Sequence, residues 1–97
     1  MPKSAREVGA GLQKKGFRLR DSHHTFYHLY VDDHKTTVWT KISHSEKEIG
    51  DRLLALMARE VKLNRSQFID LIECPLSYQD YVEHLRNEGH VARTEPS

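Results

Sequence analysis

Two adjacent histidines, His23 and His24, stand between a short basic segment and a run of strand-forming residues. Residues 17–20 alternate apolar and basic side chains, and residues 25–31 are rich in aromatic and β-branched side chains. Histidine titrates near neutral pH without help, so an imidazole can accept or donate a proton under physiological conditions. Lysine and arginine nearby would attract a phosphate and stabilise negative charge. The pattern therefore indicates acid/base chemistry on a phosphodiester.

Two histidines could divide this chemistry between them. Cleavage of RNA without a metal requires one group to remove the 2′-hydroxyl proton and another to protonate the leaving 5′-oxygen. The hairpin register expected for the strands that follow puts His24 opposite Ser43 or His44, and cross-strand neighbours lie about 5 Å apart. We therefore expect His24 and His44 to be the catalytic pair. His44 would also stand at the start of a helix, whose free N–H groups could bind phosphate.

The other histidines have simpler interpretations. In a strand, His24 and His28 lie about 13 Å apart, too far to bind one ion, so no metal site is predicted. Neighbours on a strand point to opposite faces, so only one of His23 and His24 would face a ligand. His23 is thus a candidate RNA contact, although a structural role is the simpler interpretation. His28 and His34 are expected to be surface or turn residues.

Several cationic and aromatic side chains could contact a nucleic acid. The candidate phosphate contacts are Arg18, Arg20, Lys35 and Lys41. The same four residues could equally form an ordinary solvated face. Trp39 and Tyr27 could stack on bases, or they could pack across the sheet, as aromatic residues in small sheets often do.

Length and composition indicate one globular domain. The chain has 97 residues, a net charge of +1 and 30% charged residues. Cationic residues predominate near the N-terminus and acidic residues near the C-terminus, where a partner-docking surface is one interpretation. No apolar run is long enough to span a membrane and no signal region is visible, so a cytoplasmic protein is expected. The single cysteine, Cys74, is expected to be a small buried residue rather than a nucleophile.

Helices are predicted from capping boxes and apolar spacing. Ser4 with Glu7 begins the first helix after Pro2, with Val8 and Leu12 facing the core, and Gly16 after Lys14 and Lys15 ends it. A second capping box, Ser45 with Glu48, predicts a helix from residue 46 whose apolar stripe includes Ile49, Leu53, Leu56 and Met57. A short helix is expected over residues 65–73. A third capping box, Ser77 with Asp80, opens a last helix that Gly89 closes, before a polar tail at 90–97.

Three strands are predicted between the first two helices. They cover residues 17–20, 25–31 and 36–42, and the second and third are joined by a polar turn at 32–35 so that Val31 pairs with Thr36. The resulting order, α-β-β-β-α, gives an α+β fold with a three-stranded antiparallel sheet and helices on one face. The other face of the sheet would be free to meet a ligand.

This element order and two motifs resemble the HicA toxins, small mRNA interferases of type II toxin–antitoxin systems. The motifs are Ser22-His23-His24-Thr25-Phe26 and the later Ile42-Ser43-His44. The resemblance covers residues 4–72, and residues 73–89 form a C-terminal helical extension. It implies a double-stranded-RNA-binding-domain-like fold and His24, the second histidine of the motif, as the catalytic residue. It further implies no cofactor, a HicB-type antitoxin that covers the active face, and a monomer or weak dimer when free. Asp21 stands where the family usually has glycine.

Two other functions fit parts of the sequence. A non-catalytic RNA-binding module of the same fold is one alternative. The other is a ribbon-helix-helix DNA-binding protein, with residues 36–42 as a ribbon shared between two subunits and residues 51–72 as the helices.

Overall fold

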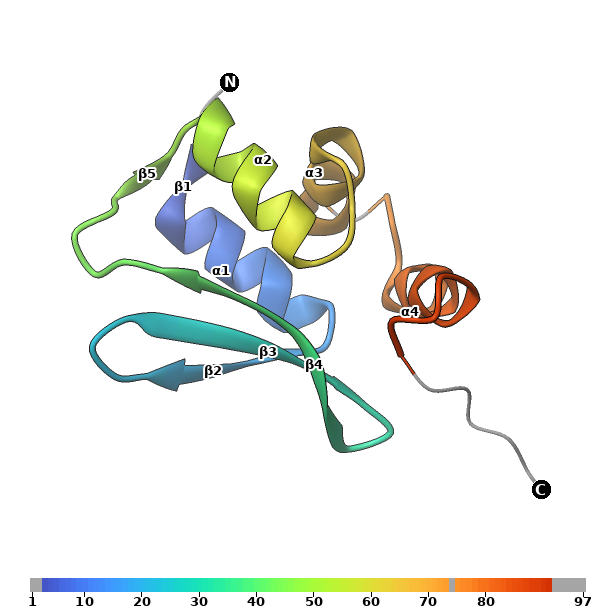
Figure 1. The fold of residues 1–97 in the computed structure, drawn as a ribbon. Helices are drawn as coiled ribbons and strands as arrows, with labels where there is room; N and C mark the ends of the chain where they lie inside the picture. Colours follow the sequence, from blue (N-terminus) through green and yellow to red (C-terminus); the bar gives the residue numbers. More distant parts are fainter. Residues whose placement is uncertain (1–2, 74, 92–97) are drawn as a thin grey trace.

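The computed structural model describes residues 3–73 and 75–91 as an α+β arrangement of a three-stranded antiparallel sheet with four helices (Figure 1). The sheet has the order β2-β3-β4, a simple meander. The helices are α1 (Ala5–Lys14), α2 (Asp51–Glu60), α3 (Arg65–Glu73) and α4 (Tyr78–Asn87), and the sheet strands are β2 (Phe17–Asp21), β3 (Thr25–Val31) and β4 (His34–Ile42). Two short strands, β1 (Lys3–Ser4) and β5 (Glu48–Ile49), form a separate ribbon.

Alternating side chains give the sheet one buried and one open face. In β4, Val38, Thr40 and Ile42 are buried, whereas Trp39 and Lys41 between them are exposed. This is the division of faces that the alternating sequence predicts. The helices lie on the buried side, with α1 running across the sheet and α2 above β4 (Figure 1).

The core gathers residues from every sheet strand and every helix. Val8 and Leu12 of α1 are fully buried, as the predicted stripe requires. Phe17 at the start of β2 stacks on Tyr81 of α4, with ring centroids 6.1 Å apart, so the C-terminal helix also packs on the core. Lys15 is only 7% exposed, and its Nζ donates hydrogen bonds to the carbonyl oxygens of Leu71 and Leu76 at 2.6 and 2.7 Å. This ammonium ties the end of α1 to α3 and to the connection that follows.

The hairpin between β3 and β4 is tighter than predicted. Asp32 and Asp33 alone form the turn, with φ of 52° and 66°, and Val31 pairs with His34 rather than with Thr36. Two successive positive φ values are the geometry of a type I′ hairpin turn, which aspartate tolerates. An irregularity between His28 and Tyr30 then shifts the register, so the far end of the hairpin pairs as predicted.

The second capping box does not start a helix. Residues 48–49 form β5, in which Ile49 pairs with Lys3 and is fully buried, and α2 begins at Asp51 with Gly50 as its N-cap. Burial of Ile49 against a distant strand outweighs a local helix signal. His44 therefore lies in a loop and not at a helix start. Leu56 also differs from its prediction, because it is 48% exposed and lies outside the core.

The first and third capping boxes are confirmed. Ser4 Oγ accepts a hydrogen bond from the Glu7 N–H at 3.0 Å, and Ser77 Oγ accepts one from the Asp80 N–H at 3.1 Å. The bounds of α3 match the predicted helix. Leu19 is an exception, because it is 45% exposed in a strand expected to be half-buried.

Some of the predictions concern residues outside the described ranges. These residues are Pro2, which was expected to precede the first cap, Cys74, which was expected to be buried, and residues 92–97 of the predicted tail. The part of that tail that the structure describes includes Val91, which is 9% exposed and joins the core.

Candidate functional site

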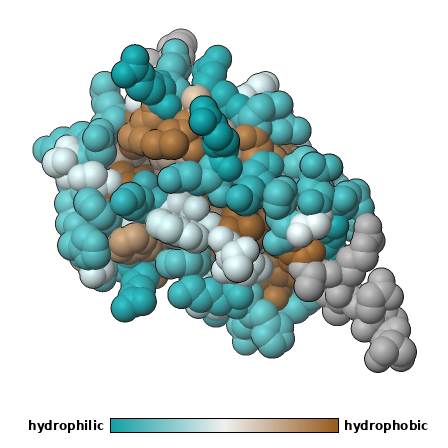
Figure 2. All heavy atoms as spheres, viewed as in Figure 1, coloured by the Kyte–Doolittle hydropathy of each residue, from teal (hydrophilic) through white to brown (hydrophobic). Residues whose placement is uncertain are grey.

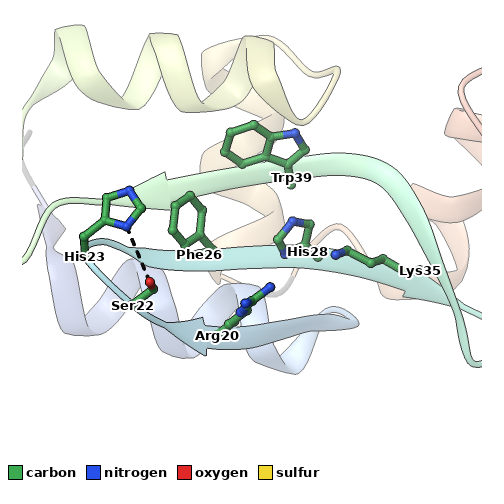
Figure 3. Close-up of a pocket in the computed structure, with 7 residues that line it drawn as sticks. All are labelled: Arg20, Ser22, His23, Phe26, His28, Lys35 and Trp39. Carbon is green, nitrogen blue, oxygen red and sulfur yellow. Dashed lines mark hydrogen bonds between the residues drawn. The ribbon is translucent and has the colours of Figure 1, made fainter.

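A hollow of about 320 Å³ lies on the open face of the sheet (Figure 3). This volume is at the lower end of the range typical of ligand sites, about 300–1,000 Å³. The residues that line it come from β2, β3, β4 and the β2–β3 loop, and they are Arg20, Ser22, His23, Phe26, His28, Lys35 and Trp39. The hollow therefore combines three aromatic or imidazole planes from the strands with two cationic side chains.

Strand pairing places the rings beside one another. Phe26 and His28 are alternate residues of β3, and Trp39 of β4 is the cross-strand partner of His28. The His28 and Trp39 rings stack with centroids 5.8 Å apart and planes 27° apart, and Phe26 stacks on His28 at 6.4 Å and 28°. The three rings form a continuous aromatic row, which we call the stacking row.

The two adjacent histidines lie in the β2–β3 loop, not in regular strand. Residues 22–24 form this loop, and the Ser22 N–H donates to the His24 carbonyl oxygen at 2.9 Å. Strand alternation, which assumed that both histidines lie in regular strand, therefore does not apply to His23 and His24. Their rings lie 4.9 Å apart, and both pack near Phe26, at 5.6 and 6.1 Å.

The environment of His24 favours its neutral form. Partial burial of the ring lowers the pKa of His24, and the neighbouring cation of Lys41 lowers it further, followed by His23 and His44. The Nδ1 atom is shielded from solvent and has no hydrogen-bond partner. Protonation would place an unsatisfied N–H there, which is costly. His24 is thus neutral at pH 7, the state that a general base requires.

Asp21 holds His44. The imidazole Nε2 lies 2.8 Å from Asp21 Oδ1, and because a carboxylate only accepts hydrogen bonds, the imidazole donates. Thr25 Oγ1 donates to the same oxygen at 3.2 Å. The hydrogen bond from His44, followed by that from Thr25, lowers the pKa of Asp21. Asp21 therefore orients a histidine.

The predicted pair, His24 and His44, is only partly brought together. The charge of His44 contributes to the lowered pKa of His24, so the two rings are within electrostatic range. His44, however, borders a second hollow of about 260 Å³, together with residues of α1, β3, β4 and the following loop: Ala5, Arg6, Thr25, Tyr27, Ile42, Ser43 and Glu46. His24 instead adjoins the stacking row.

The four predicted phosphate contacts differ in their surroundings. Arg20 and Lys35 line the hollow, and Figure 3 shows Lys35 pointing toward His28. Lys41 is exposed, and it is the cross-strand partner of Phe26. Arg18 lies 4.0 Å from the centre of the Tyr30 ring and forms an ion pair with Asp33. Arg18 is therefore engaged in contacts within the protein.

The sequence interpretation missed Phe26 and the position of His28. The signal was present, because Tyr27, Leu29 and Val31 are the buried alternate residues of β3 and leave Phe26, His28 and Tyr30 on the open face. Tyr27 is only 6% exposed and packs in the core, so the packing alternative holds for this residue. Trp39 is 41% exposed, so stacking of its ring on a base stays a prediction. Polar side chains cover most of the molecular face in Figure 2, with apolar ones in separate patches.

Neither a metal site nor a membrane span is found in the described residues. Across residues 3–73 and 75–91, no group of three or more His, Cys, Asp and Glu side chains is placed to hold a metal ion. None of the helices in that part of the chain has the length and apolar character that a bilayer span requires. Comparisons of the chain with protein-family models, curated proteins and solved structures found no match.

Proposed function

We propose that the chain is a HicA-like endoribonuclease that cleaves mRNA without a metal and has a fold similar to a double-stranded-RNA-binding domain. The observation that carries the proposal is the neutral, half-buried imidazole of His24 beside an open sheet face with exposed cations. A neutral imidazole accepts a proton, and the cations Arg20, Lys35 and Lys41 would attract the phosphate backbone.

In this proposal, His24 removes the proton from a ribose 2′-hydroxyl. The 2′-oxygen attacks the adjacent phosphorus, the bond to the 5′-oxygen breaks, and that oxygen leaves with a proton from a second group. Lys41, whose charge already acts on His24, is suited to stabilise the negative charge that develops on the phosphate oxygens. The products are a 2′,3′-cyclic phosphate and a 5′-hydroxyl.

Two imidazoles are candidates for the proton donor. His44 is the predicted partner, and its hydrogen bond to Asp21 fixes the orientation of its ring. His23 is the histidine whose ring contacts that of His24, at 4.9 Å. His44→Ala and His23→Ala variants distinguish them, because loss of the donor lowers kcat by about 10²–10⁴-fold, as is typical of a positioned acid.

The test is cleavage of an unstructured RNA by purified protein in the presence of EDTA. We expect the wild-type chain to give 2′,3′-cyclic phosphate ends, and His24→Ala to reduce the rate by at least about 100-fold. His34→Ala is the matched control, because His34 is an exposed histidine at the β-hairpin turn. Equal cleavage by the wild type and His24→Ala would refute the catalytic assignment.

A cellular partner follows from the same proposal. A HicB-type antitoxin would cover the open face in the cytoplasm. Induction of the wild-type chain should stop growth and fragment transcripts, and co-expression of an antitoxin from the same genomic neighbourhood should prevent both effects. Induction of His24→Ala should leave growth unchanged.

A non-catalytic RNA-binding module is the second candidate. The shielded, partnerless Nδ1 of His24 favours it, because this atom is closed to a substrate in the present arrangement. RNA binding with a linear log–log dependence on salt, and no cleavage at any pH, would support the module over the enzyme. The ribbon-helix-helix alternative is not proposed, since β4 pairs with β3 of the same chain as part of a three-stranded meander.

A further inference from the structure

The stacking row is an unusual surface for a sheet face without a covering helix. Trp39 is 41% exposed and one of three large apolar side chains that are exposed in residues 3–73 and 75–91, the others being Leu19 and Leu56. It stacks on His28, and its ring lies 5.9 Å from that of Phe26. Three neighbouring rings on an open face present flat, polarisable surface to a ligand.

Cations flank the row on opposite strands. Arg20 of β2 and Lys35 of β4 both line the hollow near His28 (Figure 3). Charge of this sign favours a polyanion, and a hollow of about 320 Å³ with aromatic walls suits one flat ring system. Aromatic planes with flanking cations are the combination by which proteins bind single-stranded nucleic acid.

We propose that this hollow binds one unpaired nucleobase of a single-stranded RNA by stacking against Trp39 and Phe26. The inference rests on the proposed function and names its substrate class. In a duplex, each base is stacked between its neighbours and shows only its edges in the grooves, so its flat face is not available to Trp39. The substrate is accordingly an unpaired segment of mRNA, and double-stranded RNA is excluded from the stacking site.

Trp39 provides its own reporter, because it is the single tryptophan of the chain. The probe is a single-stranded 2′-O-methyl oligoribonucleotide of about ten nucleotides, within the usual size of such sites. The 2′-O-methyl groups remove the nucleophile, so binding is measured without cleavage. An abasic oligomer of equal length and charge, and a duplex of the same sequence, complete the set.

The single-stranded probe should quench Trp39 fluorescence, and the abasic oligomer should bind more weakly with little quenching. Affinities of the variants are measured by anisotropy of a dye-labelled probe, because variants at position 39 lack the tryptophan reporter. Stacking of one base contributes about 1–3 kcal/mol, so Trp39→Ala should weaken binding of the single strand by about 5–150-fold. Trp39→Phe should retain most of the affinity. Leu56→Ala is the matched control, because Leu56 is a similarly exposed apolar residue on α2. Far-UV circular dichroism verifies that each variant is folded.

The inference is overturned by any of the following results: equal quenching by the abasic oligomer, unchanged affinity of Trp39→Ala, or binding of the duplex as tight as that of the single strand. Its failure is distinguishable from failure of the nuclease. Quenching by the single strand without any RNA cleavage would retain the stacking site and remove the enzyme. RNA cleavage that does not depend on Trp39 would retain the enzyme and remove the stacking site.

Binding only to a protein partner, with no response to any oligomer, would assign the stacking row to a protein interface and remove the nucleobase site.

Discussion

Replacing Lys15 by methionine should destabilise the fold more than any surface charge change. Methionine keeps most of the volume of the side chain but removes the ammonium that donates to the carbonyl oxygens of Leu71 and Leu76. Both oxygens would then lose a partner in a region where Lys15 is only 7% exposed. The change thus acts on the connection between the N-terminal helix and the C-terminal helices.

The magnitude follows from the two hydrogen bonds. A hydrogen bond to a charged group contributes about 1.5–3 kcal/mol, so the pair contributes about 3–6 kcal/mol. Removing a buried charge also removes its desolvation cost, which offsets part of the loss. We expect a net decrease in the free energy of unfolding of about 2–4 kcal/mol. For a domain of this size, that corresponds to a decrease in Tm of at least about 10 °C.

Urea and thermal unfolding followed by far-UV circular dichroism measure this decrease. Lys14→Met is the matched control, because Lys14 is the preceding residue of α1, carries the same charge and is exposed. It should lower stability by at most about 1 kcal/mol, the usual size of a helix-dipole contribution. If Lys15→Met and Lys14→Met unfold at the same urea concentration, the buried tie does not stabilise the fold and the reasoning is wrong.

The remaining predictions concern pH and packing. Burial lowers the pKa of both His24 and His28, so the unfolded state binds protons more tightly than the folded state. The free energy of unfolding should therefore not depend on these two histidines above about pH 7, and it should decrease as the pH falls below about 6.5. A urea midpoint that stays constant as the pH is lowered through this range would contradict the prediction. Lys41→Met should raise the pKa of His24 toward its ordinary value, so the acidic limb of the pH profile of kcat/KM should move to higher pH; an unmoved limb would exclude either the charge effect or His24 as the base. Gly11→Ala should lower the free energy of unfolding by about 1–3 kcal/mol through overpacking. An added Cβ would lie 2.8 Å from both the carbonyl oxygen and the Cγ2 atom of Ile72. A Tm equal to that of the wild type would show that α1 and α3 separate at little cost.

Local signals predicted the starts of α1 and α4 and the two faces of β4. A serine at the N-cap needs only an N–H three residues ahead, so the caps at Ser4 and Ser77 could be predicted from a few residues each. Alternation in β4 likewise fixed which residues are buried, since the period of two belongs to the strand itself. Both kinds of signal are contained within one element.

Long-range contacts decided the features that the sequence interpretation missed. The capping pattern at Ser45 and Glu48 is a sound local signal, but pairing of Ile49 with Lys3 joins parts of the chain that no local pattern connects. Lys15 was interpreted as a cation at a helix end, because its two carbonyl partners lie far along the sequence. His23 was misplaced for a related reason, since its facing depended on whether the strand begins before or after it.

The candidate site on the open face is easier to recognise in the structure than in the sequence. Helices α1 to α4 complete the core on one side of the sheet, so Phe26, His28 and Trp39 are not needed to bury the interior. A solvated strand face requires no aromatic residues at all, and lysine, glutamate or threonine would fill the same positions. These three rings, brought into contact by strand pairing and with Arg20 and Lys35 beside them, form the surface on which we propose that RNA binds. For the same reason, Trp39→Ala should alter RNA binding while leaving the unfolding transition nearly unchanged, which separates a role in recognition from a role in stability.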